Sequence, residues 1–110
     1  MNFELFTIAS FKREAKRLIK KYPSLRAEIE ALGEALQENP LLGTALNNGF
    51  YKIRLGIKSK GKGKSGGARV ITCVKVVAEK VYLVSIYDKS EQSDISEDQL
   101  EQLLTEIPES

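Results

Sequence analysis

Histidine is absent from this 110-residue sequence, and cysteine occurs only once, as Cys73. Structural zinc sites are built from several cysteine and histidine ligands, so the sequence excludes a site of that kind. Ser-His-Asp catalysis, Cys-His catalysis and ribonuclease mechanisms with paired histidines are excluded for the same reason. We therefore expect no zinc site, and we also expect no cofactor. Any acid–base chemistry must come from lysine, arginine, tyrosine or carboxylate side chains.

Long apolar runs and cysteine pairs are also missing. No apolar stretch approaches the roughly 20 residues that cross a bilayer, and the N-terminus lacks the basic segment and cleavage site of a signal peptide. One cysteine cannot form an internal disulfide framework, which fits a reducing compartment. We expect Cys73 to be a small apolar residue in a strand. The sequence thus predicts a cytoplasmic protein with no membrane partner.

Charge is distributed unevenly along the chain, although the formal net charge is only +2. Residues 50–78 contain eight basic residues and no acidic residue. Residues 87–110 contain eight acidic residues and a single basic residue, Lys89. This separation indicates a polyanionic partner at the basic end of the chain.

The N-terminal part of the chain predicts a strand followed by two helices. Residues 3–8 read as a short strand, and Ser10 is placed to cap the helix that follows. Pro23 ends this helix, and Ser24 is a good N-cap for a second one. Because the link between them is so short, we expect a helical hairpin.

The C-terminal part predicts three strands and a last helix. The expected strands are residues 50–58, 68–78 and 81–87, which form an antiparallel meander. Ser96, with Gln99 three residues later, forms a capping box before the final helix. The whole chain, residues 1–110, is thus predicted to be one α+β domain of order β-α-α-β-β-β-α. In it, the helices pack on one face of a small antiparallel sheet, and the other face carries the charges.

The segment Gly61-Lys62-Gly63-Lys64-Ser65 contains Gly-Lys pairs but lacks the spacing of a P-loop. That motif requires Gly, four residues, and then Gly-Lys followed by Ser or Thr. The residue after Gly61-Lys62 is Gly63, and Gly63-Lys64-Ser65 would need a glycine at position 58, which is a lysine. The segment also joins two predicted strands, whereas a P-loop joins a strand to a helix.

The lysine–glycine loop, residues 59–67, instead predicts binding to the phosphates of a nucleic acid. Lysines separated by glycines can reach several phosphates, and each neutralised phosphate releases counterions, so binding depends strongly on salt. The alternative is a solvated loop with no partner. The basic residues on the flanking strands and the lack of acidic ones favour phosphate binding. The expected binding residues are Lys58, Lys60, Lys62 and Lys64.

Basic residues also gather on one face of the predicted sheet. Lys52 and Arg54 are two positions apart and therefore project from the same side. Arg69 begins the next strand, and Lys89 follows the third strand, so these ends should meet at one edge. Clustered cations suit phosphoryl chemistry, because they stabilise charge on phosphate oxygens and lower the pKa of a neighbouring amine. An ordinary exposed basic face has the same spacing, so both interpretations stay open here.

The segments YKIRL, SKGKGKSGGARVI and VYLVSIYDKSE resemble the RelE/ParE superfamily of toxins from bacterial toxin–antitoxin modules, and most of all its RelE/HigB-like branch. The segments KRLIKKYPSL and ENPLLGTAL fit the same pattern, so the resemblance covers nearly the whole chain. It implies a ribosome-dependent endoribonuclease that cuts mRNA in the ribosomal A site. Relatives act without metal and use the ribose 2′-OH as nucleophile on the adjacent phosphate. The implied partners are the ribosome with its mRNA and a cognate antitoxin, which covers the basic face or braces the helices.

The resemblance also implies roles for particular residues. By position it assigns catalytic roles to Lys52, Arg54, Arg69 and Lys89. Arg69 would steady the phosphate, Lys89 would act as an acid or stabilise charge, and the loop lysines would hold ribosomal RNA. Some relatives use a tyrosine near the start of the last helix, where this chain has Asp94-Ile95-Ser96. In our hypothesis Tyr87 takes its place, and the identity of the general base stays open.

Two other functions are compatible with the sequence. A ParE-like poison of DNA gyrase shares the expected fold but cuts no RNA, and the dense basic strand face counts against it. A non-catalytic RNA-binding module would keep the basic face without the chemistry. A gyrase supercoiling assay identifies the first, and loss of binding without any activity in Arg69→Ala identifies the second.

Overall fold

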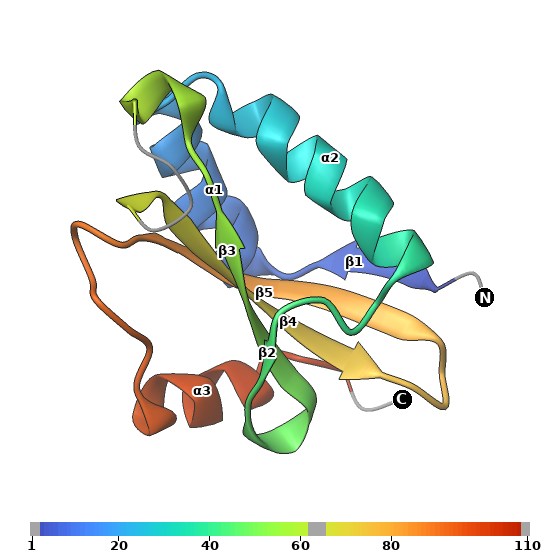
Figure 1. Cartoon of the computed structure of the whole chain (residues 1–110). Coiled ribbons are helices and arrows are strands. Elements are labelled where there is room, and N and C mark those ends of the chain that lie inside the picture. Colours follow the sequence, from blue (N-terminus) through green and yellow to red (C-terminus); the bar gives the residue numbers. More distant parts are fainter. Residues whose placement is uncertain (1–2, 62–65, 109–110) are drawn as a thin grey trace.

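The computed structural model describes residues 3–61 and 66–108, which form a five-stranded sheet and three α-helices (Figure 1). The strands are β1 (Glu4–Thr7), β2 (Thr44–Ala45), β3 (Phe50–Leu55), β4 (Ala68–Lys75) and β5 (Lys80–Asp88). The helices are α1 (Ala9–Lys21), α2 (Leu25–Glu38) and α3 (Glu97–Leu104), with 3-10 turns η1 (Asn47–Gly49) and η2 (Lys58–Lys60). Within these described ranges, no helix has the length and apolar character needed to span a membrane.

The strands follow the order β1-β5-β4-β3-β2 across the sheet. The predicted antiparallel meander of β3, β4 and β5 is confirmed, although β4 ends at Lys75, earlier than expected. One pair departs from the predicted antiparallel sheet: β1 pairs in parallel with β5, which places Glu4 opposite Lys80. The helical hairpin carries the chain across the sheet before β3 begins, so the first strand ends up beside the last one.

The predicted helical hairpin covers one face of the sheet (Figure 1). Fully buried leucines of α1 and α2, among them Leu18 and Leu36, pack there with strand residues such as Val70. Ser10 is not the N-cap that we predicted, because α1 begins after Ile8 and the Ser10 Oγ donates to the carbonyl oxygen of Val84 at 2.8 Å. This buried hydrogen bond ties the first turn of α1 to β5.

The connection between α1 and α2 is fixed to the turn after β3. Ser24 flanks α2 as predicted, but its side chain makes no capping hydrogen bond. Its Oγ instead lies 2.9 Å from the Ser59 Oγ and accepts a hydrogen bond of 2.9 Å from the Ser59 backbone N–H. The hairpin therefore holds the beginning of the lysine–glycine loop.

Helix α3 packs on the opposite face of the sheet, so the prediction that the helices share one face is wrong (Figure 1). The reason is that part of this face is apolar: Phe50, Ile71 and Cys73 are fully buried there. Leu100 and Leu103 of α3 cover them. Cys73 is thus a small buried strand residue, as expected, and charged residues occupy only part of this face.

The predicted capping box at the start of α3 is confirmed. The Ser96 Oγ accepts a hydrogen bond of 3.1 Å from the Gln99 backbone N–H, and the Gln99 side chain accepts one of 2.9 Å from the Ser96 N–H. Such reciprocal bonds satisfy two backbone donors and define where the helix begins. They fix the start of α3 three residues after Asp94.

Candidate functional site

Adjacent strands bring the predicted cations together on the face that also carries α3. Arg54 of β3 lies directly opposite Arg69 of β4, which in turn lies opposite Tyr87 of β5. Lys52 stands two positions from Arg54 and therefore projects from the same face. The convergence that the spacing predicted is thus present in the structure, in one row across three strands.

Lys89 reaches this row from the end of β5. Its backbone N–H donates to the carbonyl oxygen of Gly67 at 3.0 Å, which places it beside the beginning of β4. Its side chain is exposed, and its positive charge contributes to the lowered pKa of Asp94. Lys89 therefore lies at the same edge as Arg69, as expected.

The two arginines differ in exposure. Arg54 is exposed, whereas Arg69 is only 4% exposed and its Nη1 donates to the carbonyl oxygen of Ala68 at 3.1 Å. Like charges directly opposite each other on neighbouring strands destabilise a sheet. The pair therefore places two positive charges side by side, an arrangement that suits an anionic partner.

Tyr87 lies in the row but below the surface. It is 5% exposed, and its hydroxyl oxygen has no hydrogen-bond partner within residues 3–61 and 66–108. Burial raises the pKa of Tyr87, the negative charge of Asp94 raises it further, and the charge of Arg69 acts in the opposite direction. Tyr87 is therefore a buried, protonated phenol at neutral pH. This burial speaks against our hypothesis that Tyr87 takes the place of the catalytic tyrosine of some relatives.

Asp94 joins the candidate site, although no pattern in the sequence pointed to it. Its Oδ1 lies 2.9 Å from the Nζ of Lys52, from which it is separated by 42 positions in the sequence. The hydrogen bond from Lys52 is the main cause of the lowered pKa of Asp94, and the backbone N–H of Ile95 adds to it. Lys52 thus enters the site as one half of an ion pair.

Lys52 and Asp94 also line a shallow pocket of about 300 Å³, together with Asn47, Glu97 and neighbouring residues. Its lining mixes a cation, carboxylates and an amide, which are groups that can hydrogen-bond to polar molecules. In the part of the chain that the structure describes, no three His, Cys, Asp or Glu side chains gather in a group that could hold a metal ion.

Behind the basic row, Lys60 forms an ion pair that sequence reasoning missed. Its Nζ lies 2.5 Å from the Oδ1 of Asp88, whose side chain is fully buried, while the Lys60 side chain is 11% exposed. Ser90 Oγ donates to the same Oδ1 at 2.8 Å, and Tyr22 donates to Oδ2 at 3.1 Å. Burial alone would raise the pKa of Asp88, but the hydrogen bonds from Lys60, Ser90 and Tyr22 outweigh it and lower the pKa to about 2.

The ion pair changes the predicted set of RNA-binding lysines. The ammonium group of Lys60 donates to Asp88 and Ser90, so an RNA phosphate would have to compete with these partners for Lys60. Lys58 is exposed, as an RNA-binding residue requires. Lys62 and Lys64 lie outside the described residues.

The lowered pKa of Asp88 predicts a loss of stability in acid. The carboxyl titrates at its ordinary value of 3.8 in the unfolded chain and at about 2 in the folded protein. Its contribution to the free energy of unfolding is therefore complete above about pH 4, is lost as the pH falls toward 2, and amounts to about 2 kcal/mol. Urea denaturation of the wild type and Asp88→Asn across this range measures it. Parallel pH profiles for the two proteins would contradict the assignment.

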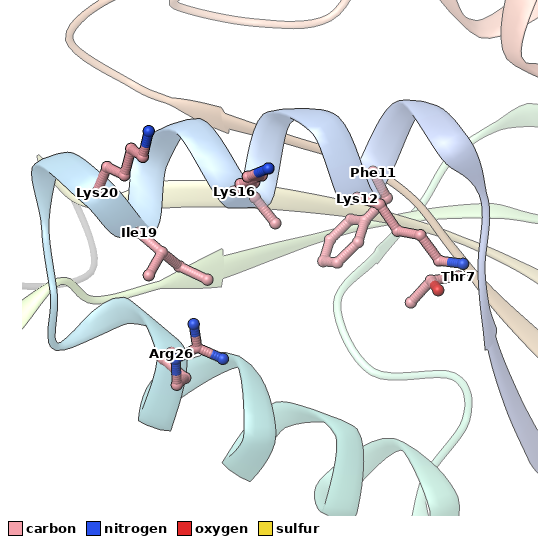
Figure 2. Close-up of a pocket in the computed structure, with 8 residues that line it drawn as sticks. Thr7, Phe11, Lys12, Lys16, Ile19, Lys20 and Arg26 are labelled. Carbon is pink, nitrogen blue, oxygen red and sulfur yellow. The ribbon is translucent and has the colours of Figure 1, made fainter.

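A second surface lies between the two helices of the hairpin, away from the strand row. An apolar groove of about 420 Å³ lies here, and Figure 2 shows Phe11 and Ile19 pointing into the space between the helices. Its rim is basic and consists of Lys12, Lys16 and Lys20 along α1 and Arg26 near the start of α2. An apolar floor with a rim of one charge is the form expected of a protein-binding surface.

Comparison with known proteins places this geometry in a family. The family model described as the RelE toxin of the RelE / RelB toxin-antitoxin system matches residues 3–107. Among solved structures, that of the E. coli toxin RelE, an arginine-to-alanine double mutant in the free state, superposes with a TM-score of 0.61. It shares 16% sequence identity, and the match covers 96% of this chain and 94% of that one, which shows a common fold. Since the family model spans nearly all of the sequence, the chain belongs to the RelE family of toxins.

Proposed function

We propose that the protein is an endoribonuclease toxin that cleaves mRNA on the ribosome and is neutralised by a cognate antitoxin. The observation that carries this proposal is the row of cations contributed by adjacent strands, beside a lysine–glycine loop, in a chain of the RelE family. Because ribosomes are the proposed target, a cytoplasmic location is part of the proposal.

The proposed chemistry is metal-independent transfer of the phosphate within the RNA. The ribose 2′-hydroxyl gives its proton to a general base as its oxygen attacks the adjacent phosphorus, the bond to the 5′-oxygen breaks, and a cyclic phosphate and a free 5′-hydroxyl result. Negative charge builds up on the phosphate oxygens in the transition state, where fixed cations have their largest effect. Arg54 and Arg69 lie opposite each other and would stabilise this charge. The exposed ammonium group of Lys89 would protonate the leaving 5′-oxygen.

Lys52 would act together with its carboxylate partner. The ion pair with Asp94 holds the Lys52 ammonium group on the same face as Arg54. A cation held in place contributes more to transition-state binding than a mobile one, because no reorganisation is needed during the reaction. We assign Tyr87 no direct contact with RNA, because its hydroxyl group is buried.

The proposal is tested by adding the purified protein to a cell-free translation reaction and mapping the mRNA by primer extension. Discrete cleavages are expected with ribosomes present and none on the same mRNA alone. Intact mRNA despite confirmed ribosome binding would refute the nuclease proposal. A gyrase supercoiling assay on the same protein would then test the ParE-like alternative.

We place the antitoxin on the groove between α1 and α2 (Figure 2). The rim cations Lys12, Lys16, Lys20 and Arg26 form no ion pair within the described ranges 3–61 and 66–108, whereas Arg17 and Lys21 on the same helix pair with Glu91. Cations around an apolar floor fit an amphipathic segment with acidic flanks. The groove therefore suits a partner of that composition better than a bare phosphate chain.

Charge reversal at the rim should weaken binding of the antitoxin. We expect Lys16→Glu together with Lys20→Glu to reduce its affinity roughly tenfold or more, mainly through slower association. Surface plasmon resonance with the co-expressed antitoxin measures this, with Glu34→Lys on the exposed side of α2 as the control. If Arg54→Ala weakens binding and the rim variant does not, the antitoxin covers the basic strand face instead.

A further inference from the structure

Asp88 stands between two residues of the candidate site but takes no part in the proposed chemistry. It is the last residue of β5, with Tyr87 before it and Lys89 after it. Its carboxylate is fully buried and accepts hydrogen bonds from Tyr22 at the end of α1 and from Lys60 of η2. A buried charge carries a large desolvation cost. The groups that hydrogen-bond to the Asp88 carboxylate indicate what this cost achieves.

The beginning of the lysine–glycine loop is attached to this carboxylate. Lys60 donates to Asp88 at 2.5 Å and to the Ser90 Oγ at 3.0 Å, and its Nζ lies 5.5 Å from the centre of the Tyr22 ring. The turn that precedes it is held separately, through the bonds between Ser59 and Ser24. The chain therefore enters the loop from a fixed point.

The end of the loop meets the same residue through the backbone. Ala68, the first residue of β4, lies opposite Asp88 in the strand register. The carbonyl oxygen of Gly67 accepts a hydrogen bond of 3.0 Å from the N–H of Lys89. Both ends of the loop are thus attached to the two-residue segment Asp88-Lys89, next to Arg69.

We propose that Asp88, through its ion pair with Lys60, is a positioning residue that anchors both ends of the lysine–glycine loop beside the cation row. Its effect on cleavage rests on the proposed function, whereas the anchoring itself does not. In this role Lys60 holds the loop in place, and the exposed Lys58 contacts the RNA. A contact of Lys60 with a phosphate would require its ammonium group to leave a fully buried carboxylate, which would leave that charge unpaired.

The test compares Lys60→Met with Lys58→Ala, two neutralised lysines on the same 3-10 turn. Methionine keeps an unbranched side chain and removes only the charged end. The double variant Lys60→Met/Asp88→Leu also removes the carboxylate, so that no isolated buried charge opposes folding. The measurements are kcat and KM on mRNA-programmed ribosomes, the salt dependence of ribosome binding, and hydrogen exchange of the Lys89 amide.

Anchoring predicts a different result for each lysine. Lys60→Met should lower kcat roughly ten- to a hundredfold with little change in KM, because displaced groups lose their alignment with the reacting atoms. Its Lys89 amide should exchange faster, although Lys60 makes no contact with that amide. Lys58→Ala should instead raise KM and reduce the slope of ribosome affinity against salt concentration, on logarithmic axes, by about 1. Exchange of the Lys89 amide should stay unchanged.

The opposite pattern overturns the proposal. If Lys60→Met raises KM, loses salt dependence and keeps wild-type amide exchange, Lys60 is an RNA contact and not an anchor. If Lys60→Met does not fold, the double variant Lys60→Met/Asp88→Leu is measured instead. Slow exchange of the Lys89 amide together with a wild-type kcat would refute anchoring. Faster exchange together with a lowered kcat would support it. Amide exchange needs no ribosome, so it tests anchoring even if the protein proves to cleave no mRNA.

Discussion

Replacing Arg69 with alanine is expected to lower the rate of mRNA cleavage on the ribosome roughly 100- to 1000-fold, the loss typical of removing one fixed donor from a charge-stabilising site. Arg69 is only 4% exposed and lies between Arg54 and Tyr87 in the strand register. A cation surrounded by protein is less screened than one in water, so it acts more strongly on a phosphate held at the surface by Arg54.

Single-turnover cleavage of mRNA-programmed ribosomes measures the effect of Arg69→Ala. Lys75→Ala is the matched control, since Lys75 lies at the opposite end of the same strand and its loss should leave the rate unchanged. Thermal unfolding of each variant separates loss of chemistry from loss of fold, because Arg69 is buried. A folded Arg69→Ala protein that cleaves at nearly the wild-type rate would remove Arg69 from the proposed mechanism.

Replacing Gly67 with alanine is expected to destabilise the protein by on the order of 3 kcal/mol, at the upper end of what overpacking costs. The added Cβ would lie 2.3 Å from the carbonyl oxygen of Leu55 and 3.0 Å from the Cα of Gly56. These are backbone atoms of the chain next to β4, and they cannot move aside as the end of a side chain can. The strands must separate where the lysine–glycine loop returns to the sheet, so cleavage should fall as well.

Gly61→Ala provides the comparison for Gly67→Ala. A Cβ at Gly61 would meet no described atom within 4 Å, but its φ of +71° is unfavourable for alanine. Its expected cost is therefore about 1 kcal/mol, from backbone strain alone. Urea denaturation of both variants measures the difference. Equal stabilities would show that the close approach of Gly67 to Leu55 does not constrain the sheet.

Much of the fold follows from periodicity that can be read in the sequence. Lys52 and Arg54 were predicted to lie on the face of β3 away from the helical hairpin, and the structure agrees: Ile53 is buried against the hairpin, while Arg54 is exposed on the other face. The capping box of Ser96 and Gln99 was equally readable, because its partners are three residues apart. Local geometry of this kind needs no knowledge of the rest of the chain.

Which distant segments pair with each other could not be predicted from the sequence. The choice of β5 as the parallel partner of β1, and the packing of α3 on the second face, depend on how the whole chain closes. The ion pairs of Lys52 with Asp94 and of Lys60 with Asp88 join residues far apart in the sequence. Without the second pair, Lys60 looks like any other lysine of a basic loop, which is why it was assigned to RNA.

The parallel pairing of β1 with β5 also governs when the sheet can be completed during synthesis of the chain. The β1–β5 pairing places Glu4 opposite Lys80, and the row of cations includes Lys89 at the end of β5. Neither the pairing nor the row can form until the ribosome has made most of the chain. Pairings between distant segments form slowly, because a long stretch of chain loses its freedom before the contact is gained. A nascent chain therefore lacks the assembled row of cations until β5 and Lys89 have been made.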